Sequence, residues 1–206
     1  MYLDFIIFIV SYFFAIFSTV GYGLISEKVM GIKKYQLNMG FIGLIGVLVL
    51  ISYSYLTHYF LPHGTTHNSI VNLLGLGFFL FFSKSRKKEI LLFIIVFTIL
   101  LLAFLVFKTH DDFPYYHFPY TVHLTENTTI FGIGLLNYGL RTPSSIFFLN
   151  SLFYLPFIKF YLFQIGAILF FGFSILILLE DIKKNIKLNQ INSNFFLKIF
   201  SLFFIL

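Results

Sequence analysis

Two neighbouring carboxylates, Asp111 and Asp112, stand directly behind an apolar stretch in a chain that is otherwise nearly free of charge. A carboxylate is costly near hydrocarbon, and one that is kept there usually has a function. Such an acid can accept a proton as a general base or help to hold a divalent cation. Adjacent side chains diverge on a helix or a strand, so we expect only one of the two to face a given cavity. The alternative interpretation is a solvated helix end that marks the membrane boundary.

Arg141 is the second candidate, because it comes directly before a helix start signal. Thr142 can cap the free amides of a helix, and Pro143 at the first helical position loses no hydrogen bond. A guanidinium beside free amides and a helix dipole favours a phosphate group. The alternative is an arginine that extends to lipid head groups or pairs with an aspartate. The residues assigned to this anion site are Arg141, Thr142, Ser144 and Ser145.

His63 and His67 are four residues apart, which on a helix would place two imidazoles on one face, as a metal site needs. Pro62 and Gly64 disfavour a helix at His63, so we interpret the pair as a substrate contact, with plain loop polarity as the alternative. No cofactor is expected beyond a possible divalent cation at the two aspartates.

The composition excludes a soluble globule. Hydrophobic residues make up 59% and charged residues only 11% of the 206 residues, and the mean hydropathy is +0.93. These values predict an all-α membrane protein, a polytopic helical bundle. The formal net charge of +6 does not indicate a nucleic-acid partner, because the basic residues lie in short loops between apolar runs. Their placement is typical of membrane topology.

Apolar runs and basic loops predict the topology. Three segments, 27–36, 84–88 and 183–198, hold eleven of the fourteen Lys and Arg residues and are expected in the cytoplasm, with the N-terminus and all six histidines outside. We therefore predict four transmembrane helices in 1–107, an outer, periplasmic loop with interfacial helices in 108–156, and a fifth transmembrane helix, a cytoplasmic linker and the start of a sixth in 157–206. A chain that ends at Leu206 is expected to be part of a longer protein. The predicted complete runs are Phe5–Ile25, Gly40–Tyr59, Ser69–Phe82, Ile90–Phe107 and Phe157–Leu179.

Two further segments are expected to be helical without crossing. Pro143–Leu155 is predicted to be an interfacial or re-entrant helix on the outer face, because a crossing there would move the lysines at 183–187 outside. Pro156 is the predicted break before the next span. Asp181–Asn194 is interpreted as a short helix on the cytoplasmic surface, or as a solvated linker.

An ordered series of motifs begins at the two aspartates. The series resembles the signature stretch of a family of bacterial multi-pass membrane proteins that is itself similar to GT-C glycosyltransferases. The residues that carry the resemblance are Asp111 to Pro119, Gly132 and Gly134, Asn137 to Arg141, and Ser144 to Phe153.

The resemblance implies a GT-C-like N-terminal part whose outer loop transfers a sugar from a polyprenyl-phosphate donor to an envelope glycan, lipid or protein acceptor. Asp111 or Asp112 would then be the general base or a metal ligand, and Tyr116 and His117 would line the sugar pocket. Arg141 and the amides of 142–145 would hold the lipid-linked phosphate. The expected partners are membrane lipids, the lipid-linked donor and an acceptor, and the expected location is the bacterial inner membrane.

A non-enzymatic transporter or flippase-type protein, or an inactive truncated subunit, is the alternative function. A transporter should place ionisable residues near the bilayer midplane. The five complete apolar runs carry none in their interiors, which favours chemistry at the outer surface over permeation.

Overall fold

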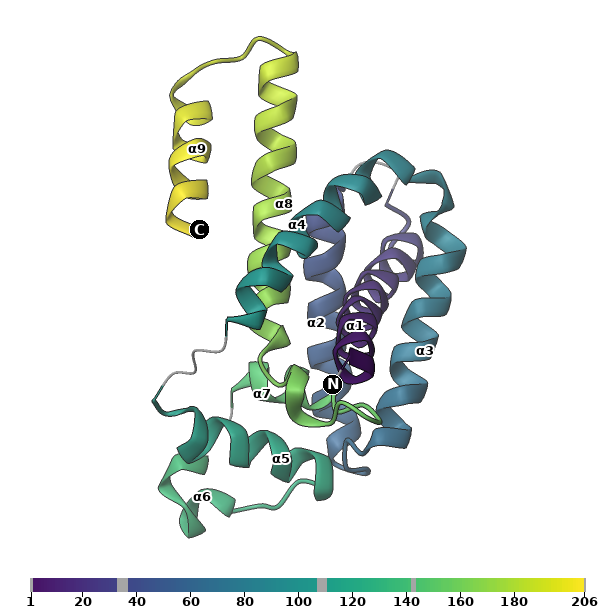
Figure 1. Ribbon diagram of the computed structural model, residues 1–206, viewed down its shortest axis with the longest axis vertical. Coiled ribbons are helices and arrows are strands. Elements are labelled where there is room, and N and C mark those ends of the chain that lie inside the picture. The colour runs from purple at the N-terminus through teal and green to yellow at the C-terminus, as the bar shows by residue number, and fades with distance from the viewer. Residues whose placement is uncertain (1, 33–36, 107–110, 142–143, 206) are drawn as a thin grey trace.

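The computed structural model describes residues 2–32, 37–106, 111–141 and 144–205, and within them every regular element is a helix (Figure 1). The predicted all-helical class is thus confirmed for this part of the chain. The long helices are α1 (Tyr2–Val29), α2 (Met39–His58), α3 (Thr65–Phe82), α4 (Lys87–Leu105), α8 (Ile165–Lys187) and α9 (Ser193–Ile205). The short elements are η1 (Ser83–Ser85), η2 (Phe113–His117), α5 (Phe118–Glu126), α6 (Ile133–Leu136), η3 (Tyr138–Leu140), α7 (Ser145–Ser151) and η4 (Phe160–Leu162).

Four helical segments of the described chain are long and apolar enough to cross a membrane. They are α1, α2, α3 and the continuous stretch Phe160–Lys187, which contains η4 and α8. The apolar parts of α4 and α9 are shorter. Because a crossing needs about 20 apolar residues, the fold is that of a helical membrane protein.

Helix α3 starts four residues before the predicted run Ser69–Phe82. Gly64 is its N-cap in an extended conformation, and the polar first turn continues directly into the apolar part. The hydropathy pattern misses this turn because its residues are polar, although Asn68 is fully buried. The added turn gives α3 its spanning length.

Helices α1, α2 and α3 pack closely because glycines remove side chains where the helices meet. A Cβ added at Gly21 of α1 would overlap the carbonyl oxygen of Gly75 of α3. A Cβ at Gly46 of α2 would overlap the carbonyl oxygen of Thr19. Small residues allow such close backbone approach between membrane helices, where dispersion contacts replace the hydrophobic driving force.

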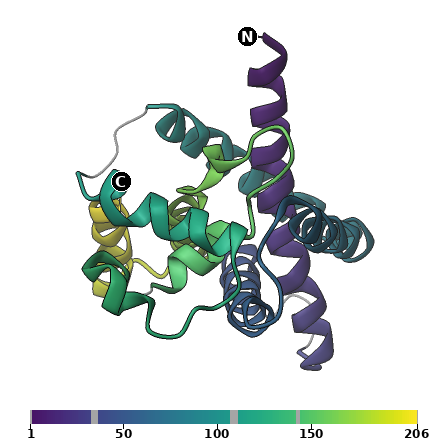
Figure 2. The same ribbon diagram turned by 90° about the horizontal axis from the view of Figure 1, so that it is seen from below.

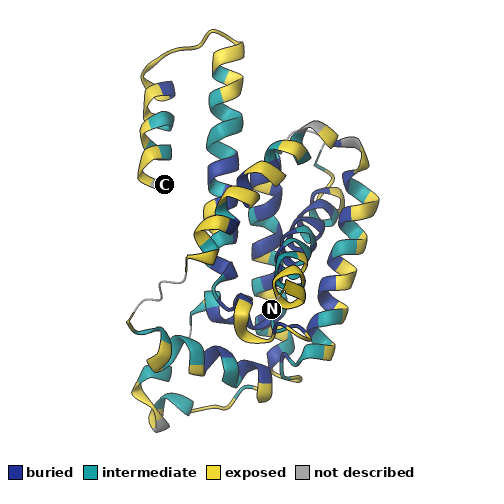
Figure 3. Ribbon diagram, in the orientation of Figure 1, coloured by how far each residue is buried: buried dark blue, intermediate teal, exposed yellow. Residues whose placement is uncertain are grey.

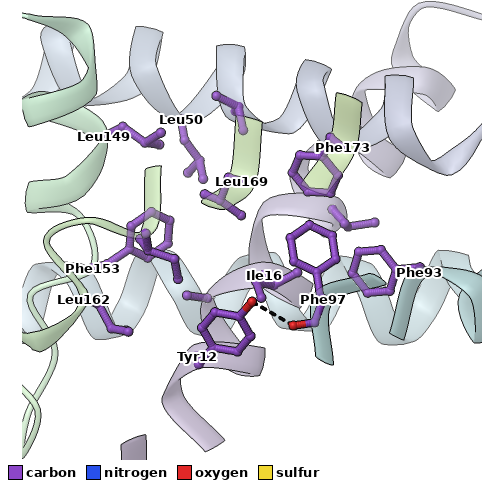
Figure 4. Close-up of a cluster of buried hydrophobic side chains, with 14 of the residues drawn as sticks. Tyr12, Ile16, Leu50, Phe93, Phe97, Leu149, Phe153, Leu162, Leu169 and Phe173 are labelled. Atoms are coloured by element: carbon purple, nitrogen blue, oxygen red, sulfur yellow. Dashed lines mark hydrogen bonds between the residues drawn. The ribbon is translucent and has the colours of Figure 1, made fainter. Parts of the chain in front are cut away.

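Aromatic side chains join this group to α4 and α8 (Figure 4). The hydroxyl of Tyr12 in α1 donates to the Phe97 carbonyl of α4 at 2.9 Å. The ring of Phe97 meets Phe173 of α8 edge-on, with centroids 5.1 Å apart. The core is therefore formed by the five long helices α1, α2, α3, α4 and α8, and it supports the short segments at its end.

The two ends of the bundle differ in chemistry. We call the end that carries residues 26–32, 37–38 and 83–89 the basic end, and the end that carries residues 58–65, 111–141 and 144–164 the site end. At the basic end the guanidinium of Arg86 is buried and binds Glu27 at 2.6 Å, Glu89 at 2.9 Å and the Leu37 carbonyl at 3.0 Å. These bonds tie α1, the α1–α2 connection and α4 together.

At the site end, α5 lies across the helix ends instead of parallel to them, with α6 beyond it (Figures 1 and 2). Helix α7 differs from the predicted Pro143–Leu155 helix, because within the described residues it covers only Ser145–Ser151. Residues 147–151 of α7 are all buried, so the helix packs inside the protein between α2, α5 and α8. The interfacial or re-entrant position of this segment on the outer face stays a prediction. Thr142 and Pro143 lie outside the described residues, and the cap is Ser144.

The next span also starts later than predicted. The run Phe157–Leu179 was expected to be helical throughout, but α8 begins at Ile165. Phe157 and Lys159 have positive φ angles of 71° and 42°, which form a tight turn before η4. At its other end α8 continues to Lys187, so the first half of the predicted surface segment Asp181–Asn194 belongs to this helix. Lys198 of α9 pairs with Asp181 at 2.9 Å, and Figure 3 shows that most of α9 is exposed.

Candidate functional site

Asp112 and Tyr116 form a hydrogen-bonded pair at the site end. The Tyr116 hydroxyl donates to the Asp112 carboxylate at 2.9 Å, and this bond raises the pKa of Tyr116. Tyr116 belongs to a single π-helical turn, η2, in which the Phe118 amide donates to the Phe113 carbonyl, and Asp112 is the N-cap of this turn. Wide turns of this kind occur often at functional sites. Asp112 is half-buried and Asp111 exposed, so the two carboxylates differ in environment as expected for neighbours.

An open pocket of about 700 Å³ is lined by Tyr116 of this pair, whereas Asp112 is not among the lining residues. Tyr116 and His117 both line it, as does Ser144 of the predicted anion site. The remaining lining residues are Phe113, Thr121, Ile146, Phe147, Asn150, Phe163, Gln164 and Ala167. We call this cavity the Tyr116 pocket. Its mixture of aromatic faces and hydrogen-bonding groups is typical of a small-molecule site.

Aromatic contacts fix the walls of the Tyr116 pocket. The His117 ring meets Tyr116 edge-on with centroids 4.4 Å apart, and it packs on Phe147 at 5.0 Å. Asn150 comes from α7, and its side-chain oxygen accepts the Gly166 amide of α8 at 2.8 Å. The pocket thus joins η2, α5, α7 and the start of α8, segments that are well separated in the sequence.

The predicted anion site is divided in the structure. Arg141 lies at a second cavity of about 610 Å³, which we call the Arg141 pocket. Ser144 instead lines the Tyr116 pocket, and its hydroxyl accepts the Ile146 amide as the cap of α7. Ser145 is exposed at the first position of α7, and Thr142 lies outside the described residues. The described residues of the predicted set therefore do not converge on one phosphate.

His63 and His67 line neither of these pockets. Their rings are stacked with centroids 5.3 Å apart and an interplanar angle of 10°, so their nitrogens do not aim at a common point. Nδ1 of His63 lies 2.7 Å from the Ser151 hydroxyl, and Nε2 of His67 lies 3.0 Å from the Tyr53 hydroxyl. Because Ser151 donates to the Phe148 carbonyl, His63 donates to Ser151 from Nδ1.

Burial keeps His63 neutral. The imidazole is fully buried, and burial lowers its pKa to about 3, with further lowering from the neighbouring histidines 58 and 67. His123 on α5 also has a lowered pKa because of burial, partly opposed by Glu126. A neutral imidazole carries one N–H, which His63 donates from Nδ1 to the Ser151 hydroxyl.

Two asparagines on α3 attach α7 to the bundle. The Asn68 side-chain amide donates to the carbonyls of Ser151 at 2.7 Å and Tyr154 at 3.0 Å, and the Asn72 amide donates to the Leu152 carbonyl at 2.9 Å. The last carbonyls of a helix have no partners within that helix. In a membrane they must find donors inside the protein. Asn68 and Asn72 supply those donors and so hold the end of α7, a helix whose residues Phe147 and Asn150 line the Tyr116 pocket.

The described residues do not fit a chelated metal ion. No group of three or more His, Asp or Glu side chains lies together in a way that could hold one in this part of the chain. Asp112 accepts the Tyr116 hydroxyl.

Sequence reasoning missed several residues of the site. Thr121, Asn150 and Gln164 line the Tyr116 pocket but are single polar residues with no distinguishing spacing. Asn68 and Asn72 did carry a signal, because two asparagines four apart on an apolar helix share one face and need buried partners.

Comparisons of the chain with protein-family models, with curated proteins and with solved structures found no match.

Proposed function

We propose that the chain is a membrane glycosyltransferase of the bacterial inner membrane that transfers a sugar from a polyprenyl-phosphate donor at the outer face. The hydrogen bond between Asp112 and Tyr116 at the Tyr116 pocket is the observation that carries the proposal. The GT-C-like motif series, which includes both residues, supplies the reaction class. The site end is then the outer end, and the lysine-rich basic end is cytoplasmic.

In this reaction an acceptor hydroxyl attacks the anomeric carbon of the donor sugar. The bond from that carbon to the phosphate oxygen breaks, polyprenyl phosphate leaves, and the acceptor proton passes to the Asp112 carboxylate. A carboxylate has about four acceptor positions, so Asp112 can take this proton while it accepts the Tyr116 hydroxyl. Tyr116 acts as a positioning residue, because its bond fixes the direction of the carboxylate.

The walls of the Tyr116 pocket suit a sugar. Hydroxyl, amide and imidazole groups from Ser144, Asn150 and His117 can bind sugar hydroxyls, and the aromatic faces exclude water. Asp111 is exposed and has no comparable contact with a residue of the pocket among the described hydrogen bonds. The geometry thus favours Asp112 over Asp111 as the base.

The test uses membranes that contain the chain, supplied with a panel of radiolabelled polyprenyl-phosphate sugars. Asp112→Asn is expected to lower transfer by about 100-fold or more, within the usual contribution of a general base. Glu126→Gln removes an exposed acid at the far end of α5 and is the matched control, expected to keep the parental rate. Parental transfer by Asp112→Asn would refute the base, and no labelled product from the parent with any donor would refute the function.

A further inference from the structure

The Arg141 pocket is separate from the proposed transfer chemistry. It is bounded by the last turn of α2, by α5 and by the chain that runs through α6 and η3. Tyr120 and Phe148 line it, whereas Phe147 lines the Tyr116 pocket. The Tyr120 ring packs on Phe147 with centroids 5.6 Å apart, and Phe148 stacks on Tyr55 at 4.1 Å. These rings form a wall between the two cavities.

The Arg141 pocket lies where a membrane surface would be. Two tyrosines line it at the end of α2, a helix long enough to cross a membrane: Tyr55 belongs to the last turn and Tyr59 is the C-cap. Tyrosine is enriched at the boundary between the hydrocarbon and water, because its ring is apolar and its hydroxyl is polar. The pocket therefore opens at the level of lipid head groups.

Two contacts fix the position of the Arg141 side chain and leave its charge available to a ligand. Its Nε donates to the Gly134 carbonyl at 3.2 Å, and the guanidinium lies 3.7 Å over the Tyr138 ring. The described residues give Arg141 no ion pair, and the side chain is exposed. A guanidinium fixed in this way can still bind phosphate oxygens through its two terminal nitrogens.

Large apolar side chains surround Arg141 and face outward. Phe131 is 85% exposed, Leu135 82% and Tyr138 75%, although all three belong to a segment outside the candidate spans. An exposed apolar patch beside a cation matches the two parts of a lipid, since the patch can contact chains while the cation binds the phosphate.

We infer that the Arg141 pocket binds an anionic membrane phospholipid. The guanidinium of Arg141 holds the phosphate, and Phe131 and Leu135 contact the adjoining acyl chains. Charge complementarity and the position of Tyr59 favour this ligand over a free anion, which would gain nothing from the apolar lining. The bound lipid anchors the segment 130–141 to the membrane surface. This inference does not depend on the proposed function.

The test places the full 206-residue chain in nanodiscs that contain a photoactivatable phosphatidylglycerol, and maps the labelled peptides by mass spectrometry. Labelling of residues 130–138 is expected, and Arg141→Gln is expected to reduce it about tenfold, the effect of losing a charge-assisted contact. Arg141→Lys should retain part of the labelling. Lys159→Gln removes another exposed cation outside the pocket and is the matched control.

Labelling of helix α9 serves as the folding control, because that helix lies far from the pocket (Figure 1). Equal labelling by an otherwise identical phosphatidylcholine probe, unaffected by Arg141→Gln, would show ordinary lipid contact and overturn the inference. If polyprenyl phosphate displaced the probe and excess phosphatidylglycerol did not, the pocket would bind a different lipid and the inference would be overturned.

Discussion

Replacing Asn68 with leucine should loosen the site end without altering either pocket lining. The side-chain amide of Asn68 donates to three carbonyls, those of His63, Ser151 and Tyr154, at 2.7, 2.7 and 3.0 Å. The Ser151 carbonyl also accepts the Tyr154 amide at 3.2 Å, so it keeps one partner in the variant. The carbonyls of His63 and Tyr154 lose the Asn68 donor, in a region from which water is largely excluded.

Each buried polar group that loses its partner costs about 1–3 kcal/mol, and polar contacts between membrane helices lie toward the lower end of that range. We therefore expect Asn68→Leu to lower the free energy of unfolding by about 2–4 kcal/mol. The effect should be concentrated in α7, because the Ser151 carbonyl is the last of that helix and the Tyr154 carbonyl comes shortly after it.

Unfolding in mixed micelles, titrated with dodecyl sulfate and followed by circular dichroism, measures the loss. Hydrogen exchange of the α7 amides locates it. Asn127→Leu makes the same chemical change at an exposed asparagine after α5 and should change stability by less than about 0.5 kcal/mol. Equal stability of the two variants, or unchanged exchange in α7, would refute the reasoning.

Two further outcomes follow from buried contacts. The folded pKa of His63, about 3, is below the value near 6.5 of an unfolded histidine, so its contribution to stability is complete above pH 6.5 and declines as the pH falls. Between pH 6.5 and 4.5 the loss of stability from His63 amounts to about 2–3 kcal/mol. The His63→Asn variant should lack this part of the pH dependence. Identical pH profiles of the variant and the parent would contradict the burial of His63. Gly21→Ala should destabilise the protein by at least about 2 kcal/mol, because the added Cβ meets the Gly75 carbonyl. Gly77→Ala has open space around the added Cβ and should be neutral or stabilising by up to about 1 kcal/mol. A thermal melt of both alanine variants compares them directly, and shifts in the same direction would argue against the close packing of α1 and α3.

Hydropathy predicted the spans whose information is local. The runs Phe5–Ile25 and Gly40–Tyr59 lie within α1 and close to the bounds of α2, because continuous apolar sequence is sufficient to identify them. The start of α3 was missed because Thr65–Asn68 is polar. Its one buried residue, Asn68, has partners more than eighty residues away. Hydropathy cannot detect a polar residue whose partners are distant.

The candidate site likewise contains some features that local sequence predicts and others that depend on distant partners. Tyr116 and His117 are sequence neighbours of the aspartates, and the structure places both at one pocket. Arg141 and Ser144 are also close in sequence, yet they line different cavities. His63 meets Ser151 across 88 positions, a pairing that residue spacing alone could not predict.

The capping of α7 by α3 has a consequence for how the chain is assembled during synthesis. Helix α7 has seven residues, too few to cross a membrane, and its last carbonyls depend on donors from Asn68 and Asn72. It therefore has no stable place in the bilayer until α3, which is made about seventy residues earlier, has been inserted. The Tyr116 pocket is thus among the last parts of the described protein to form, and an insertion defect in α3 would appear first as a missing pocket.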